Sequence, residues 1–263
     1  MMTIREYKRA ESLEEAWQLN QKKANRILGG MIWLKMETIN VGTAIDLSGL
    51  GLDTIEETDA GFSIGAMVTL RQLETHPGLE AFTHGAVREA LRHIVGVQLR
   101  NLATVGGSIY SRFGFSDVLT LLLVMDSYVE LYKGGIVPLA DFVNMPYDRD
   151  ILVRVIVKKT AAHYSYKSVR ISKTDFPVLT CAAALTQEGV QAAMGARPAK
   201  AALVKDAEQL ATLPMTAEKA QAFAEYAADL LPTESNPRGS AAYRTHLIKV
   251  LTARCLTELG GKA

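Results

Sequence analysis

The sequence predicts a fold that mixes short strands with helices in two compact units, and three observations support this. The chain has 263 residues, 48% of them apolar, which suffices to bury a core without disulfide or metal staples. Its first part alternates short apolar runs with Gly, Asp and Ser turns and with helical stretches. Near residue 160 the character changes to an antiparallel meander followed by an Ala-rich helical end, and we place a domain boundary there.

The first elements follow from local signals. A helix is expected after Ser12, because Glu15 stands at the spacing of a capping box and apolar residues follow at helical intervals. Residues 24–33 and 38–51 each predict a short strand that runs into a Gly or Asp-Ser-Gly turn, and residues 61–68 repeat the pattern.

The middle of the chain predicts further helices around a Gly-rich segment. Thr69 is expected to cap a short helix, and residues 82–97 have the period of another. A polar turn is expected at Thr104 to Ser108, and Ser116 and Asp117 begin an apolar helix. The strands expected beyond it cover residues 127–132, 150–158, 164–171, 177–186 and 189–196.

Charge and composition exclude several classes of protein. Lys and Arg number 29 against 28 Asp and Glu, and no local basic patch indicates a nucleic-acid or membrane partner. The N-terminus lacks the apolar core of a signal peptide, and the longest apolar run, Val118 to Met125, is too short to span a membrane. Cys181 and Cys255 stand far apart in apolar surroundings, which predicts buried free thiols in a reducing, cytoplasmic compartment.

The usual sequence traces of acid–base, nucleophilic or metal catalysis are missing. The sequence contains no GxSxG, HExxH, P-loop or GxGxxG motif, and its five histidines are scattered without ligand spacing. We therefore expect no catalytic side chain and no metal ligand.

Two Gly-Gly pairs, Gly29–Gly30 and Gly106–Gly107, stand out instead. Backbone N–H groups of such a turn can converge on an anion because no Cβ intervenes, although either pair alone also fits an ordinary hairpin turn. The second pair lies between Thr104 and Ser108, whose hydroxyls can donate to phosphate, and Asp117 follows with a carboxylate that can accept from ribose or adenine. Together they predict a dinucleotide site outside the Rossmann pattern.

The run from Arg100 to Ile109, RNLATVGGSI, followed by Ser116 and Asp117, resembles the signature of the FAD-binding subunits of molybdenum hydroxylases. This family includes the flavin subunits or domains of xanthine dehydrogenase and carbon monoxide dehydrogenase. The similarity extends over most of the chain and includes residues 41–77, 138–142, 166–179 and 238–254.

The resemblance implies an α+β fold. Residues 1–159 would form an FAD-binding domain of the PCMH type, with two α/β subdomains that divide near residues 55–60. Residues 160–263 would form an antiparallel sheet with helices, similar to the C-terminal domain of carbon monoxide dehydrogenase flavoproteins.

The resemblance also implies the FAD-binding residues. The loop Thr104 to Ser108 would hold the pyrophosphate and Asp117 the ribose. In the first loop Met31 and Ile32 replace the family's polar residues, so one or two hydrogen bonds to phosphate, each worth about 0.5–1.5 kcal/mol, are expected to be lost. The residues assigned to the cofactor are Ile27, Leu28, Gly29, Gly30, Met31, Ile32, Trp33, Ile94, Thr104, Val105, Gly106, Gly107, Ser108, Asp117, Leu152, Lys167 and Phe176.

Five of these assignments rest on position alone. Ile94 matches a position beside the isoalloxazine ring, Leu152 would offer backbone to the adenine, and Lys167 approximates a lysine near the cofactor. Phe176 fits either a flavin-covering ring or a core residue. Trp33 fits either a flavin neighbour or, as the favoured reading, the core.

The function implied is that of an FAD electron-transfer subunit. Its partners would be an iron–sulfur subunit and a molybdopterin-binding subunit, with NAD+ or another compound as the acceptor. Two alternatives stay open: a flavin-free structural or assembly subunit of such a complex, favoured by Met31 and Ile32, and a stand-alone flavin reductase.

Overall fold

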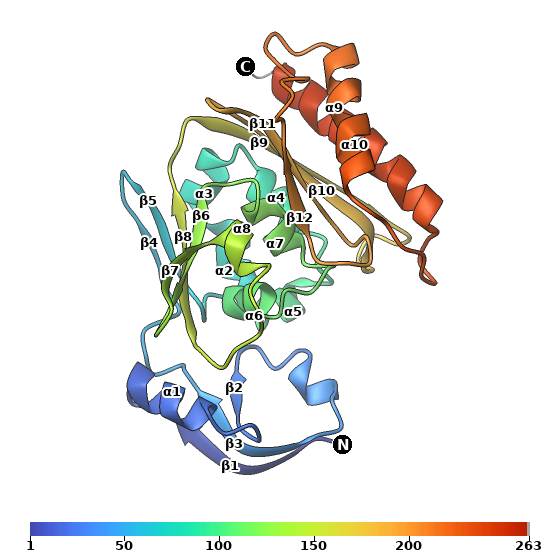
Figure 1. The fold of residues 1–263 in the computed structure, drawn as a ribbon. Coiled ribbons are helices and arrows are strands. Elements are labelled where there is room, and N and C mark those ends of the chain that lie inside the picture. Colours follow the sequence, from blue (N-terminus) through green and yellow to red (C-terminus); the bar gives the residue numbers. More distant parts are fainter. Residues whose placement is uncertain (262–263) are drawn as a thin grey trace. The chain divides into compact units, whose positions relative to one another are not determined.

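The computed structural model describes residues 1–261 and mixes helices with strands (Figure 1). The chain divides into two compact units made of interleaved segments. Unit 1 contains residues 1–73, 97–111 and 127–157, and unit 2 contains residues 74–96, 112–126 and 158 onward. The α+β fold is confirmed. The boundary between residues 159 and 160 stays a prediction, because these units do not divide the chain by a single cut.

Unit 1 begins with a parallel three-stranded sheet of order β1-β3-β2. Its elements are β1 (Thr3–Arg9), α1 (Leu13–Asn20), β2 (Arg26–Leu28), the 3₁₀ helix η1 (Leu34–Met36) and β3 (Asn40–Asp46). Helix α1 begins as predicted, because Ser12 Oγ accepts a hydrogen bond from the amide of Glu15 at 3.1 Å. Its buried face, with Ala16, joins Ile45 of β3 in an apolar core.

A five-stranded sheet of order β4-β5-β8-β6-β7 completes the strands of unit 1. They are β4 (Ile55–Glu57), β5 (Gly61–Gly65), β6 (Ser127–Leu131), β7 (Gly135–Pro138) and β8 (Leu152–Lys158). β8 lies in the middle of this sheet, and its apolar residues Val153, Val155 and Val157 are buried. The central position of β8 fixes the segment just before it, residues 148–151, against the rest of the unit.

Short helices link these strands. They are α2 (Leu70–Thr75), α5 (Val97–Arg100), α6 (Val105–Tyr110) and α8 (Leu139–Phe142). Thr69 caps α2 as predicted, since its Oγ1 accepts from the amide of Gln72 at 3.2 Å. The turn predicted at Thr104 to Ser108 is wrong: Thr104 is the extended N-cap of α6, and both following glycines lie in its first turn.

Unit 2 contains the predicted meander, an antiparallel sheet of order β12-β11-β10-β9. Its strands are β9 (Ala162–Arg170), β10 (Pro177–Thr186), β11 (Gly189–Gly195) and β12 (Ala202–Lys205), and its helices are α3 (Pro77–Phe82), α4 (Ala86–Leu91), α7 (Asp117–Leu122), α9 (Ala217–Leu230) and α10 (Ala241–Gly260). Helices cover both faces of β10: Thr180 contacts Thr120 of α7, and its neighbour Cys181 contacts Thr252 of α10 (Figure 1). This double cover explains the continuous apolar run of β10.

Two details of unit 2 test the sequence reading. The single helix predicted over residues 82–97 is wrong, because His84 (φ 48°), Gly85 (φ 88°) and Val95 (φ 48°) take left-handed conformations that interrupt it. Cys181 and Cys255 are buried free thiols, as predicted.

Candidate functional site

Unit 1 contains a cavity of about 330 Å³. Its wall is built from the end of β2, the turn after β5, the start of α6 and the segment before β8. Seven of the predicted FAD-binding residues line it: Ile27, Leu28, Gly29, Thr104, Gly106, Gly107 and Leu152. The structure therefore brings Gly29 and Gly106, 77 positions apart in sequence, to one cavity of a size found for small-molecule sites.

The glycines of the first loop permit the close approach of the second. A Cβ on Gly30 would lie 1.8 Å from the carbonyl oxygen of Leu102, and a Cβ on Gly29 would lie 2.9 Å from Thr104 Oγ1. Any side chain at Gly30 would push the two loops apart. The pair is thus required by packing and is not an ordinary hairpin turn, since no strand follows it directly.

The first loop also leaves its backbone donors unused. Within residues 1–261, the amides of Gly29, Gly30, Met31 and Ile32 donate to no protein acceptor. Met31 has φ 60°, and a left-handed residue next to ordinary backbone makes consecutive N–H groups converge on an anion. This loop has the donor set that a phosphate requires.

The second loop differs, because its donors are already used. The amides of Val105 and Gly106 donate to the carbonyls of Val68 and Ala66, each at 2.8 Å. The amide of Gly107 donates to Thr104 Oγ1 at 3.1 Å. Ser108 donates through both its amide and its hydroxyl to the carbonyl of Thr104. The exceptions are the amide of Thr104 and its hydroxyl hydrogen, which have no acceptor in the described chain.

Sequence reasoning missed a polar part of the same cavity wall, formed by Asn25, Arg26 and Arg149. Arg149 donates to the carbonyls of Lys22 at 2.9 Å and Asn25 at 3.0 Å, and also to the carbonyl of Asn20. No local motif marks these residues, because Arg149 meets its partners across more than 120 positions of sequence.

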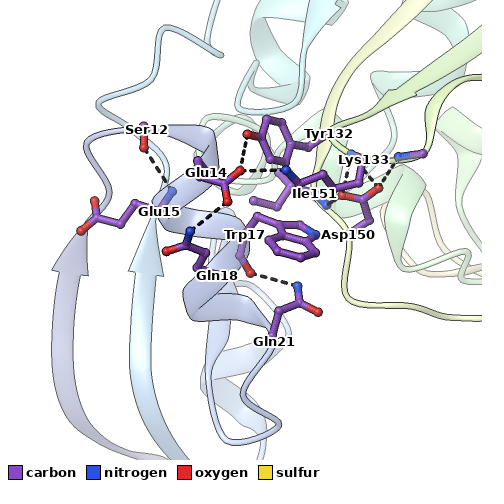
Figure 2. A network of polar contacts seen from close by, with 11 residues as sticks. Ser12, Glu14, Glu15, Trp17, Gln18, Gln21, Tyr132, Lys133, Asp150 and Ile151 are labelled. Carbon is purple, nitrogen blue, oxygen red and sulfur yellow. Dashed lines mark hydrogen bonds and ion pairs between the residues drawn. The ribbon is translucent and has the colours of Figure 1, made fainter.

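A network beside this wall ties α1 to the sheet of β8 (Figure 2). Glu14 of α1 accepts from the hydroxyl of Tyr132 at 2.7 Å and from Lys133 Nζ at 2.8 Å. The Lys133 ammonium also lies 4.9 Å from the ring centre of Trp17. These bonds hold the pKa of Glu14 down at about 2, with the bond from Lys133 the largest cause. The carboxylate of Asp150 accepts a hydrogen bond from the amide of Lys133.

Asp117, the predicted ribose ligand, lies in unit 2 and has protein partners there. Its carboxylate accepts from the hydroxyl of Tyr166 at 2.5 Å and from the guanidinium of Arg170. Burial raises the pKa of Asp117 from 3.8 to about 6, although Arg170 and Tyr166 act to lower it. The carboxylate at the start of α7 is therefore built into a buried network.

The remaining predicted residues of unit 2 are also placed. Lys167 forms an ion pair with Glu258 at 2.6 Å. The ring of Phe176 lies 4.8 Å from that of Phe115 and 4.9 Å from the guanidinium carbon of Arg238, and it is partly buried. Ile94 follows α4 and its amide donates to the carbonyl of Leu91.

Trp33 corrects one expectation. Its side chain is 41% exposed, so the favoured reading of a core residue is wrong. Met31 and Ile32 are half-buried beside it, whereas Val105 is fully buried.

Residues 2–159 match the family described as the FAD binding domain in molybdopterin dehydrogenase, and residues 164–259 match the CO dehydrogenase flavoprotein C-terminal domain. The chain therefore belongs to the family of FAD-binding subunits of molybdenum hydroxylases, a family of oxidoreductases, and its cofactor is FAD.

Curated relatives cover nearly the whole chain. An uncharacterized protein of Escherichia coli K12, YgfM, is 28% identical over 95% of this chain and 94% of its own length. The nicotine 6-hydroxylase medium subunit of Paenarthrobacter nicotinovorans is 27% identical over 97% of both chains.

Solved structures share the fold. A carbon monoxide dehydrogenase from Hydrogenophaga pseudoflava aligns with a TM-score of 0.88 over 98% of both chains, at 23% identity. Quinoline 2-oxidoreductase from Pseudomonas putida 86 aligns with a TM-score of 0.87 over 98% of this chain and 97% of its own, also at 23% identity.

The residues present fit FAD. Gly29 and Gly106, which have no room for a Cβ, line one cavity with the Thr104 hydroxyl, and the unused amides of the first loop begin at Gly29; this is the donor set expected for a dinucleotide phosphate. In the described chain no cluster of three or more His, Cys, Asp or Glu could hold a metal ion. Among these residues, none of the helices is both long and apolar enough to cross a membrane.

Proposed function

We propose that this chain is the electron-transfer subunit of a multi-subunit molybdenum hydroxylase. Its FAD would take electrons from the iron–sulfur clusters of a partner subunit and pass them to NAD+ or another acceptor. The observation that supports this most strongly is the cavity of unit 1, which Gly29 and Thr104 both line and beside which the amides of Gly29 to Ile32 are unused. The relatives support the assembly, since one of them is a hydroxylase medium subunit by name.

FAD supplies the redox chemistry, and the chain supplies placement. The amides of Gly29 to Ile32 would donate to the phosphates, and the Thr104 hydroxyl would add a side-chain donor. Leu152, at the start of β8, would offer backbone groups to the adenine.

The predicted contacts in unit 2 stay proposals of the same kind. Ile94 and Phe176 would lie beside the flavin ring, and Lys167 would place a positive charge near it. Asp117 would reach the ribose only by sharing a carboxylate that already accepts from Tyr166 and Arg170.

The partners follow from chemistry that the chain lacks in its sequence. Two cysteines are too few for a cluster held by four thiolates, so the electrons would come from a separate iron–sulfur subunit. That subunit would in turn be reduced by a molybdopterin-binding subunit.

The test is the visible absorption spectrum of the purified chain, followed by heat release and identification of any flavin. The proposal expects bands of oxidised flavin and FAD in near-equimolar amount. Expression with a tag in the native host then tests the assembly, with clusters and molybdenum expected in the same purified complex.

Two outcomes would contradict the proposal. A colourless chain that takes up no added FAD would favour a flavin-free assembly subunit. A chain that binds FAD, purifies alone and reduces flavin with NAD(P)H would favour a stand-alone reductase.

A further inference from the structure

Two arginines line the cavity of unit 1 beside the glycine loops, together with the carboxylates of Asp148 and Asp150. Arg26 and Arg149 both line it, and within residues 1–261 neither forms an ion pair with a carboxylate. They lie close enough that the charge of Arg26 lowers the pKa of Arg149, after burial as the larger cause. Two neighbouring cations that form no ion pair are costly in a partly desolvated wall unless an anion joins them.

The carboxylates of the same wall do not serve as that anion. Asp148 accepts from the hydroxyl of Tyr110 at 2.8 Å. Asp150 accepts from the amides of Lys133, Gly134 and Ile151 at 2.8–3.1 Å. Asp148 Oδ1 and both oxygens of Asp150 thus accept from neutral donors, and neither carboxylate forms an ion pair with Arg26 or Arg149 among the described residues.

Each of the two guanidinium groups has N–H donors without an acceptor among the described residues. Arg149 uses Nε and Nη2 for carbonyls of residues 20–25, which leaves Nη1 without an acceptor in the described chain. Arg26 uses only Nη1, for the carbonyls of Lys23 and Asn25. Free guanidinium N–H groups are well matched to phosphate oxygens.

Arg149 also fixes the segment that carries Arg26. The side chain of Asn20 donates back to the carbonyl of Arg149 at 2.8 Å, and that of Gln21 does so at 3.1 Å. Asn25 Oδ1 accepts from the amide of Thr43 at 2.9 Å. The segment between α1 and β2, which leads directly into Gly29, is held from both sides.

We propose that Arg26 and Arg149 form a cationic wall that binds the diphosphate of the dinucleotide opposite the amides of Gly29 to Ile32. This inference rests on the proposed function and deepens it by assigning the charges that neutralise the ligand. The wall explains how the loop holds a phosphate although Met31 and Ile32 contribute no side-chain donor.

The test is a titration of the flavin-depleted chain with FAD and, separately, with ADP, at low and high salt. Arg26→Gln and Arg149→Gln are each expected to raise the Kd for both ligands at least about tenfold, the loss of a charge-assisted bond. Their salt dependence should also become shallower, because one screened attraction is gone. Arg26→Lys should recover most of the affinity. Arg5→Gln in the exposed strand β1, outside the cavity, is the matched control and should leave both quantities unchanged.

Binding of FAD and ADP within twofold of wild type by both glutamine variants would overturn the inference. A higher Kd of the glutamine variants with an unchanged salt dependence would overturn it as well. Should Arg149→Gln fail to fold by circular dichroism, Arg26→Gln decides, since Arg26 bonds only its own segment. The proposed function fails separately, when the wild-type chain binds ADP through these arginines but neither holds FAD nor transfers electrons.

Discussion

The two glycine loops look alike in sequence and do opposite things in the structure. In Gly29 to Ile32 the amides have no acceptor among the described residues, whereas in Val105 to Ser108 they are bonded to the protein. The carboxylate of Asp117, which ends the same signature, is likewise occupied. Both Gly-Gly pairs make a close backbone contact, so the hydrogen-bond partners of their amides, and not the glycines themselves, distinguish the two loops.

The largest effect is expected from Gly30→Ala. Its Cβ would meet the backbone of Leu102 at 1.8 Å, which no side-chain rotation relieves, so the free energy of unfolding should fall by about 3 kcal/mol or more. FAD binding should be lost with it. Urea denaturation and flavin content measure both.

Gly107→Ala is the comparison for that variant. Its Cβ would meet only Thr104 Oγ1 at 3.1 Å, so a smaller loss is expected. Equal losses for the two alanines would mean that the loops do not differ as described.

Asp117→Asn tests whether the carboxylate has a structural role, because the stability of the two proteins should depend differently on pH. The folded pKa of about 6 lies above 3.8, so the contribution of Asp117 to stability is full below about pH 4 and is lost as the pH rises through 6. Relative to the asparagine variant, wild type should lose up to about 3 kcal/mol over this range. Urea denaturation of both proteins at several pH values measures the difference. If the stability of wild type relative to the asparagine variant instead rose with pH, the folded pKa of Asp117 would be lowered.

Thr104→Val separates capping from cofactor binding. It removes the acceptor of the Gly107 amide, which should cost about 1 kcal/mol of stability. It also removes the hydroxyl hydrogen of Thr104, which has no acceptor among residues 1–261, and this should weaken FAD binding several-fold. Thr216→Val is the matched control, because Thr216 caps α9 in the same way but lies in unit 2. That control should lose similar stability and no FAD affinity; equal FAD loss in both would refute a direct role of Thr104.

The smallest effect is expected at Met31. Asparagine tolerates φ 60° better than methionine and adds a donor, so Met31→Asn should raise stability by a few tenths of a kcal/mol and tighten FAD binding a few-fold. A thermal melt and an FAD titration check this. Met36→Asn, in the nearby helix η1 and 71% exposed, should change neither.

Sequence patterns predicted most local elements and several residues that line the cavity, but not the hydrogen bonds between them. The cap at Ser12, the meander and the buried thiols follow from neighbours in sequence or from apolar patterning. The helix predicted over residues 82–97 failed because left-handed residues such as His84 and Val95 carry no sequence signal. Arg149 was missed because its partners are fixed by tertiary contacts.

Resemblance to the family supplied FAD, but it assigned the pyrophosphate to Thr104 to Ser108 and expected the first loop to be weakened by Met31 and Ile32. The structure distinguishes the two loops, since the amides at the start of α6 are hydrogen-bonded to the protein and the amides after β2 are not. Distances across the fold, such as that from Gly30 to Leu102, cannot be read from either motif.

Amide hydrogen exchange of the chain with and without FAD tests the central claim most directly. The account predicts that FAD slows exchange in peptides covering Gly29 to Ile32 and leaves the amides of Val105 to Ser108, already bonded, nearly unchanged. Protection confined to the second loop, with the first unchanged, would contradict it.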